Sequence, residues 1–294
     1  MRSGFVALIG RPGAGKSSLL NRLVGHRVAI TSATPPTTRS RQQGILTLEG
    51  AQIVFVDTPA VHVPRHRLGQ RMMAETRRAV AESDVLVAVF DASAPLSAED
   101  RLTAALVREA GKPAVAVLNK VDRPPAADLS LLGDHIRALA PFAAVVSASA
   151  VRGEAAAALV AAVLPLLPEG PQFFPPQMIT DRSEPLRVRE LIQEQVMALT
   201  REELPHGVAV EIEEFAPRPE GPTYIRAILH VERDAHRKML IGRGGRMLKA
   251  IGTRARAEVE RLLGRRVYLD LWVKTSRDWR RRDALLRRFY PEQQ

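Results

Sequence analysis

The first half of the chain alternates short apolar runs with longer stretches whose apolar residues recur every three or four positions. The runs have the length of buried strands, and the spaced stretches have the pattern of amphipathic helices. One predicted helix covers residues 98–110, ended by Gly111, and another covers 153–164. The predicted strands are residues 5–9, 45–48, 53–56, 85–91, 114–118 and 143–146. This alternation is typical of an α/β domain with a mostly parallel sheet.

The pattern changes after residues 168–185, which contain five prolines. We predict a semi-rigid linker over 169–183, between a first domain at 1–168 and a second at 184–294. The second domain has predicted helices over 184–204 and on both sides of 242–245, strands over 208–213, 225–231 and 267–273, and a basic helix over 277–289. Helices and alternating strands in this order indicate an α+β domain.

Composition and charge narrow the choice of function. The 294 residues include no cysteine, which excludes disulfides, thiolate zinc sites and a cysteine nucleophile. The longest apolar stretch, 155–167, is too short to span a bilayer, so we expect a cytoplasmic protein. Residues 233–294 hold 18 Lys/Arg against 7 Asp/Glu, an excess of +11 that equals the net charge of the whole chain. A nucleic acid or an acidic lipid is the expected partner, and a solvated basic surface is the alternative.

A glycine-rich segment follows the first predicted strand and precedes a helical pattern. Residues 10–17 read GRPGAGKS, which matches the phosphate-binding loop GxxxxGK[ST] in its strand–loop–helix setting. Backbone N–H groups and the helix N-terminus would hold phosphate oxygens, Lys16 would reach the β- and γ-phosphates, and Ser17 would bind Mg²⁺. A glycine-rich turn before an ordinary helix is the alternative. The predicted phosphate-binding residues are Gly10, Arg11, Pro12, Gly13, Ala14, Gly15, Lys16, Ser17 and Ser18.

Two further segments offer ligands for Mg²⁺. Residues 31–39 form a Thr/Pro-rich loop, in which a threonine could coordinate the metal when a triphosphate is bound. Asp57 ends the predicted strand 53–56 and fits the aspartate that holds Mg²⁺ through water. An aspartate that only caps the strand is the alternative for this position.

The segment Asn119-Lys120-Val121-Asp122 carries the prediction of base specificity, because it reads NKxD at the end of an apolar strand. The carboxylate of Asp122 can accept hydrogen bonds from guanine N1–H and the exocyclic amine, whereas adenine would leave it unpaired. Asn119 and Lys120 would brace the loop and lie along the base. A backbone N–H of Ser147, Ala148 or Ser149 could meet the guanine O6.

The basic second domain contains a GxxG turn at residues 242–245, between two helical stretches. Such a turn lets a nucleic-acid backbone approach closely, and an apolar groove beside it accepts about four single-stranded bases. The predicted RNA-binding residues are Gly242, Arg243, Gly244, Gly245, Arg246 and Lys249. A glycine-rich turn between helices is the alternative. Trp272 and Trp279 could stack on bases, but we favour packing in the core or at an interface for both.

Taken together, the strings GRPGAGKSSLLNRL, PPTTRSR, DTP, NKVD and SAS, followed by TREELPHGVAVEIEEF and LIGRGGRMLKAIGTRAR, resemble the Era family of bacterial GTPases over essentially the whole chain. The resemblance implies a Ras-like P-loop GTPase domain followed by a type II KH domain. It also implies Mg²⁺ and GTP or GDP as ligands, binding to the 3′ region of 16S rRNA, and assistance in 30S subunit assembly. Association with the inner face of the cell membrane is a further implication of the family.

By this resemblance Thr38 is the switch-loop threonine that binds Mg²⁺, and Ser17 and Asp57 complete the metal site. Lys16 and Thr38 are the predicted catalytic residues. The predicted guanine-nucleotide site also includes Thr58, Pro59, Ala60, Asn119, Lys120, Asp122, Ser147, Ala148 and Ser149.

The chain departs from the family pattern at two positions. Gly13 stands where an asparagine helps to hold a monovalent cation, which puts potassium stimulation in doubt. Ala60 replaces the glycine of the family's DTPG, so the freedom of positive φ is lost there. Val61 follows where Ras has its water-orienting glutamine; an apolar residue is usual in this family and implies slow intrinsic hydrolysis.

We therefore expect a monomeric, GTP-switched RNA-binding assembly factor. The alternative is a nucleotide-dependent RNA-binding scaffold with negligible turnover, and a membrane-surface GTPase is a third hypothesis.

Overall fold

The structure is a computed structural model, and it describes residues 1–31, 38–153, 156–202 and 204–290. Its main division into two compact units falls between Asp181 and Arg182. Within the described ranges, no helix is both long and apolar enough to cross a membrane.

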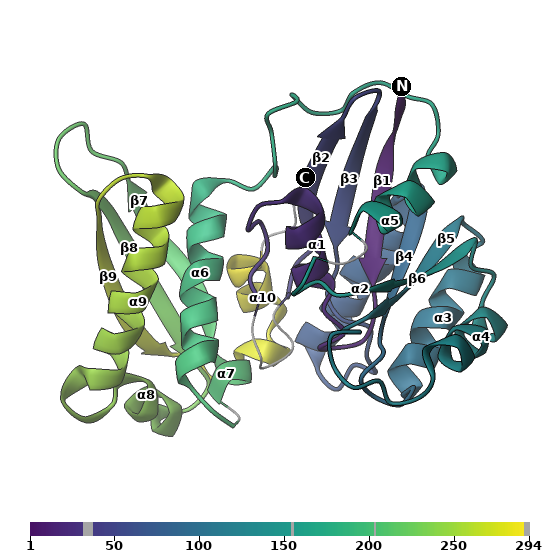
Figure 1. Cartoon of the computed structure of the whole chain (residues 1–294). Helices are drawn as coiled ribbons and strands as arrows, with labels where there is room; N and C mark the ends of the chain where they lie inside the picture. Colours follow the sequence, from purple (N-terminus) through teal and green to yellow (C-terminus); the bar gives the residue numbers. More distant parts are fainter. Residues whose placement is uncertain (32–37, 154–155, 203, 291–294) are drawn as a thin grey trace. The chain divides into compact units, whose positions relative to one another are not determined.

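The first unit is built around a six-stranded sheet with the order β2-β3-β1-β4-β5-β6 (Figure 1). Only β2 runs antiparallel to its neighbour, and the other pairings are parallel. The strands are β1 (Arg2–Ile9), β2 (Gln42–Leu48), β3 (Ala51–Asp57), β4 (Val85–Asp91), β5 (Ala114–Asn119) and β6 (Ala144–Ala148). The expected α/β class is thus confirmed, and β1 begins three residues earlier than predicted.

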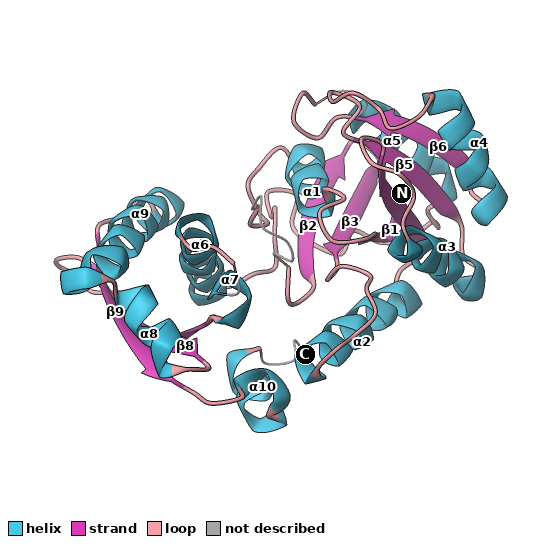
Figure 2. Cartoon of the chain, turned by 90° about the horizontal axis from the view of Figure 1, so that it is seen from below, coloured by secondary structure: helices cyan, strands magenta, loops and turns pink. Residues whose placement is uncertain are grey.

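Helices cover both faces of this sheet, which explains why its central strands are continuous apolar runs. The helices α1 (Lys16–Val24) and α5 (Ala156–Val163) pack on one face, and α2 (Arg67–Glu82), α3 (Ala98–Ala110) and α4 (Leu129–Leu139) on the other (Figure 2). Alternate residues of β1 enter the two cores: Val6 and Leu8 face α1, whereas Ala7 and Ile9 face the opposite side. The sequence analysis did not predict α2 or α4.

Most of the proline-rich segment expected to be a linker lies along the edge of the first unit. The side-chain amide of Gln52 accepts hydrogen bonds from the backbone N–H groups of Phe173 (2.8 Å) and Phe174 (3.0 Å). Further along, Ile179 O accepts from Ile45 N (3.0 Å), and Thr180 Oγ1 donates to Gln43 O (2.8 Å). The segment is therefore held against β2 and β3 as far as Thr180.

The second unit has a three-stranded sheet in the order β7-β8-β9, with β7 antiparallel and β9 parallel to β8. The strands are β7 (Ala209–Ala216), β8 (Thr223–Val231) and β9 (Val267–Thr275). The helices are α6 (Glu184–Leu199), α7 (Leu204–Gly207), α8 (Asp234–Ile241), α9 (Arg246–Leu263) and α10 (Asp283–Phe289). Apolar side chains of α6 and α9 pack on one face of the sheet and form the core, which confirms the expected α+β class.

Two expected helices are shorter than predicted. The helix expected over 184–204 ends at Leu199, because Thr200 is extended, with φ −111° and ψ 162°. The basic helix expected over 277–289 is a 3-10 turn (Trp279–Arg281) followed by α10, because Arg282 is extended between them. Trp279 is fully buried, and its Nε1 donates to Gly207 O at 2.9 Å, so packing is confirmed for this residue. Trp272 is 61% exposed, so it does not pack in the core, and packing at an interface stays a prediction for it.

Candidate functional site

The phosphate-binding loop lies at the carboxyl end of β1, where the sheet order places β3 and β4 on either side. Its glycines adopt backbone conformations that side chains disfavour, with φ 74° at Gly13 and 99° at Gly15. A Cβ on Gly15 would collide with the side-chain amide nitrogen of Asn119. The loop is therefore closed against the end of β5, and its backbone can surround an anion.

Lys16 is buried at the start of α1 with its ammonium group turned back toward the loop. Its Nζ donates to Gly10 O at 2.9 Å and to Arg11 O at 3.3 Å. Burial lowers the pKa of Lys16 to about 8, against the opposing effect of the nearby Asp57 carboxylate. A buried, partly desolvated ammonium beside inward-facing amides fits a multiply charged phosphate ligand.

The three predicted metal ligands converge beside Lys16. Ser17 Oγ donates to Asp57 Oδ2 at 2.6 Å, Thr38 Oγ1 donates to the same oxygen at 3.1 Å, and the two hydroxyl oxygens are 3.0 Å apart. All three side chains are buried. Two hydroxyls and one carboxylate are hard oxygen donors of the kind Mg²⁺ takes in phosphate sites. The residues present thus fit the metal.

The NKVD segment lies at the same edge of the sheet as the phosphate-binding loop, where β5 and β6 end. Asn119 Nδ2 donates to Ala14 O at 2.8 Å, and its Oδ1 accepts from Ala150 N at 3.2 Å. Asp122 Oδ1 accepts from Ser149 Oγ at 2.6 Å, and this bond is the main reason that the pKa of Asp122 is lowered. The structure thus brings the predicted base-reading aspartate, the serine–alanine–serine loop and the phosphate loop together.

The sequence analysis missed two aspartates that contact the phosphate-binding loop, one of which also contacts the NKVD segment. Asp91, at the carboxyl end of β4, accepts from Lys120 Nζ at 2.6 Å and lies 3.3 Å from Arg11 NH2. Arg11 Nε also lies 3.2 Å from Asp100 Oδ2, in the capping box of α3. Lys120 also has a left-handed backbone, with φ 69°. An aspartate ending a buried strand, as at Asp57, was the available signal.

The segment after Asp57 packs against the phosphate loop. Thr58 Oγ1 donates to Leu8 O at 2.8 Å, Pro59 O accepts from Thr76 Oγ1 at 2.9 Å, and Val61 N donates to Gly10 O at 3.0 Å. Ala60 is buried and does not take the positive φ that would require glycine. Alanine at this position is thus free of backbone strain in this conformation.

The predicted RNA-binding turn lies between α8 and α9 in the second unit. Gly242, Gly244 and Gly245 all have positive φ (73°, 58° and 77°), and a Cβ on Gly242 would meet Met247 N at 2.9 Å. Arg243, Arg246 and Lys249 are exposed. Beside the turn is a groove of ≈ 410 Å³ between α9 and β9, lined by Gly245, Leu248, Lys249, Gly252, Thr253, Arg256, Tyr268, Leu269 and Leu271. Its apolar floor and basic rim suit bases and phosphates respectively.

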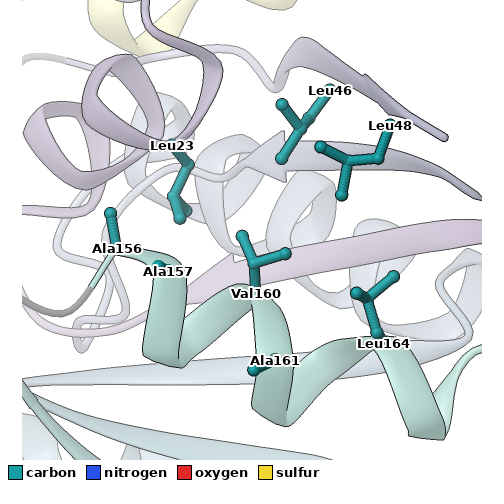
Figure 3. A pocket seen from close by; sticks show the side chains of 8 residues that line it. All are labelled: Leu23, Leu46, Leu48, Ala156, Ala157, Val160, Ala161 and Leu164. Atoms are coloured by element: carbon teal, nitrogen blue, oxygen red, sulfur yellow. The ribbon is translucent and has the colours of Figure 1, made fainter.

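A separate hollow of ≈ 420 Å³ in the first unit lies between α1, the end of β2 and α5 (Figure 3). Only aliphatic side chains line it: Leu23, Leu46, Leu48, Ala156, Ala157, Val160, Ala161 and Leu164. These side chains offer no hydrogen-bond donor to a phosphate or a base. The hollow is therefore not part of the nucleotide site.

Comparison with known proteins agrees with this organisation. A sequence family described as "50S ribosome-binding GTPase" matches residues 5–120, and the KH domain family matches residues 203–280. The chain is 42% identical over 289 residues to GTPase Era of Carboxydothermus hydrogenoformans, covering 98% of this chain and 97% of the relative. It is also 42% identical over 287 residues to GTPase Era of Halothermothrix orenii, with the same coverage.

Two solved structures match the whole chain. A variant of Aquifex aeolicus Era bound to GDP·AlF4⁻ is 38% identical, with a TM-score of 0.94 and 99% of each chain covered. Era in complex with MgGDPNP and nucleotides 1506–1542 of 16S ribosomal RNA is 39% identical, with a TM-score of 0.95 and 99% of each chain covered. With this identity along nearly its full length, a Ras-like P-loop unit and a KH unit in the same order, the chain belongs to the Era family of GTPases.

Proposed function

We propose that this GTPase uses GTP binding and hydrolysis in its first unit to control how its second unit holds single-stranded ribosomal RNA, and so assists assembly of the 30S subunit. The observation that carries the proposal is the occurrence, in one chain, of the buried Lys16–Ser17–Thr38–Asp57 cluster and the basic groove beside Gly242–Gly245. Related Era structures that hold GDP·AlF4⁻, or MgGDPNP with 16S rRNA, support the extension of those ligands to this chain.

The nucleotide roles follow from the geometry of the site. Ser17, Thr38 and Asp57 would hold Mg²⁺, which neutralises phosphate charge when it is bound. Lys16 would move its donors from the carbonyls of Gly10 and Arg11 to the β- and γ-phosphates, and Asp122 would accept from the guanine edge. The remaining predicted residues, Gly10 to Ser18, Thr58 to Ala60 and Ser147 to Ser149, would contribute backbone donors and packing.

Hydrolysis would be an in-line attack of water on the γ-phosphate, in which Lys16 stabilises the developing charge. Val61 is buried and offers no group that orients water, and His62 Nδ1 lies 2.7 Å from Ala60 O. The described residues thus place no free side-chain base beside the predicted phosphate position, so we expect slow intrinsic turnover. The alternative, a scaffold with negligible turnover, is favoured by Gly13 and Ala60, because both replace residues with functional roles in the family.

In the second unit, Arg243, Arg246 and Lys249 would contact phosphates while the groove between α9 and β9 holds about four bases. The proposed partner is the 3′ region of 16S rRNA in the 30S subunit. We further propose a cytoplasmic monomer with domains at 1–168 and 184–294, and a weaker association with the inner membrane surface through its basic C-terminal residues.

The deciding experiment is steady-state GTP hydrolysis, measured in potassium and in sodium buffers, with and without an RNA that matches the 3′ end of 16S rRNA. We expect slow turnover that this RNA stimulates and that Lys16→Ala abolishes. Tight GTP binding without turnover in every condition would instead establish the scaffold. Full RNA binding and 30S assembly activity in Lys16→Ala would refute the switch.

The RNA site has a matched pair of variants on one helix. Lys249 lines the groove, whereas Arg261 lies on α9 outside it and pairs with Glu258. Lys249→Ala should weaken RNA binding and lower its salt slope by about 1, and Arg261→Ala should change neither. Equal effects of the two variants would show that only diffuse charge acts. Competition between RNA and anionic vesicles tests whether the two partners use the same surface.

A further inference from the structure

A short loop at residues 149–153, directly after β6, contacts the predicted base-reading aspartate. Ser149 O accepts from Gly153 N at 2.8 Å, which closes the loop into a single turn. Ser149 Oγ accepts from Arg152 N at 3.0 Å and donates to Asp122 Oδ1 at 2.6 Å. The orientation of the Asp122 carboxylate therefore depends on how the backbone of this loop is held.

One side chain of α1, the helix that begins at the phosphate-binding loop, reaches this backbone. The Nε of Arg22 donates to Ala150 O at 3.2 Å, and its NH2 group donates to Val151 O at 2.6 Å. A guanidinium presents its donors in a rigid planar fork, so bonds to two successive carbonyls hold both peptide units together. Arg22 thus connects the phosphate-binding helix to the loop beside the predicted base site.

The last residue of the loop leaves the space that this guanidinium occupies. Gly153 has a left-handed backbone, with φ 79°. A Cβ at this position would lie 2.9 Å from Arg22 Cζ and 3.0 Å from Arg22 NH1, closer than real Cβ contacts allow. Glycine therefore does two things here: it takes the positive φ with which the turn closes, and it lets the guanidinium lie directly against the turn.

The two carbonyl contacts act on different N–H groups of the loop, because the C=O and N–H of a trans peptide unit point in opposite directions. The unit that joins Val151 and Arg152 is held at both ends, by Arg22 at its carbonyl and by Ser149 Oγ at its N–H. The bond to Ala150 O turns the Val151 N–H away from Arg22. Among the described residues no hydrogen bond engages this N–H, so it is available to a base.

We propose that Arg22 is a positioning residue for guanine recognition, which acts by holding the carbonyls of Ala150 and Val151. It fixes the Ser149 hydroxyl that braces Asp122, and it directs the Val151 N–H that would donate to guanine O6. This inference rests on the proposed guanine site and adds to it a residue outside the predicted nucleotide-binding segments. The competing explanation is that Arg22 only stabilises the packing of the loop on α1.

The test compares Mg·GDP with the Mg²⁺ complex of 2-aminopurine riboside diphosphate, which keeps the ribose and both phosphates but lacks O6 and N1–H. Calorimetry measures GDP binding, and the emission of the aminopurine measures binding of the analogue. The wild-type protein should prefer GDP. Arg22→Ala should weaken GDP binding by about 3- to 10-fold, the effect of losing one or two exposed hydrogen bonds, and leave binding of the analogue unchanged. Arg22→Lys, which can still donate to one carbonyl, should recover part of the preference.

Two further variants separate this role from the loss of a positive charge. Arg101→Ala removes an equal charge from an exposed position on α3 and should change neither affinity. Gly153→Ala displaces the guanidinium from the side of the loop and should lower the preference for GDP as Arg22→Ala does. Equal weakening of both nucleotides by Arg22→Ala, or no weakening of either, would overturn the inference. A wild-type protein that does not prefer GDP would instead refute the proposed guanine site.

Discussion

Nucleotide binding is expected to take up a proton at mildly alkaline pH, because the pKa of Lys16 is lowered to about 8 by burial. Among the described residues, the ammonium group donates to two carbonyl oxygens, and the neighbouring Asp57 carboxylate supplies the opposing negative charge. A di- or triphosphate adds two or more negative charges beside it and raises its pKa again. The charged form is thus favoured in the complex, and binding weakens as the pH rises through 8.

The size of the effect follows from this single pKa. At pH 8 about half of the free protein has a neutral Lys16, so binding should take up about half a proton. The uptake should fall to about a tenth of a proton at pH 7 and rise to about nine tenths at pH 9. Affinity should be about tenfold weaker at pH 9 than at pH 7.

Isothermal titration calorimetry with Mg·GDP at pH 8, in two buffers of different ionisation enthalpy, measures the uptake directly. The terminal phosphate of GDP has its second pKa near 6 and contributes little at this pH. Lys16→Arg is the matched control, because a guanidinium stays charged and should bind without proton uptake. No uptake by the wild-type protein at pH 8 would refute the reasoning, since Lys16 would then be fully charged before the nucleotide arrives.

Three substitutions test other parts of the structure. Ser17→Ala removes a hydroxyl that lies 2.6 Å from Asp57 Oδ2. A Mg²⁺ titration of GTP binding should then show that half-maximal binding needs at least a tenfold higher Mg²⁺ concentration. Asp91→Asn breaks the ion pairs with Lys120 and Arg11, whose side chains are about one-fifth exposed. Urea unfolding should show that the free energy of unfolding falls by about 1–2 kcal/mol, and a fluorescence titration should show weaker GDP binding. Unchanged values would disprove the link between the two loops. Trp279→Ala empties a fully buried site and should destabilise the second unit by about 3–5 kcal/mol in urea unfolding, whereas a loss below 1 kcal/mol would contradict tight packing there.

The strands of the first unit were predictable because strands buried on both faces read as continuous apolar runs. Helices α2 and α4 were missed although the sequence carries their signal: the buried residues Leu68, Met72, Met73 and Val80 of α2, and Leu132 and Ile136 of α4, follow helical spacing. The ends of α6 and of the basic C-terminal segment were also misplaced. In both, a residue with extended backbone stops the helix although the residues beyond it are compatible with one.

The sequence by itself determined the candidate ligand-binding segments, because the motifs GRPGAGKS, NKVD and GxxG each lie within a few consecutive residues. Only the tertiary structure decided which distant groups meet. The contact of Arg11 with Asp91 and of Asp91 with Lys120 exists because β1, β4 and β5 are neighbours in the sheet. The two tryptophans have opposite environments for the same reason: Trp279 is fully buried beside Phe289 and Tyr290, whereas Trp272 is 61% exposed on β9, the edge strand of the second sheet. Local chemistry can be read along the chain, but burial and ion pairing depend on which elements the fold places side by side.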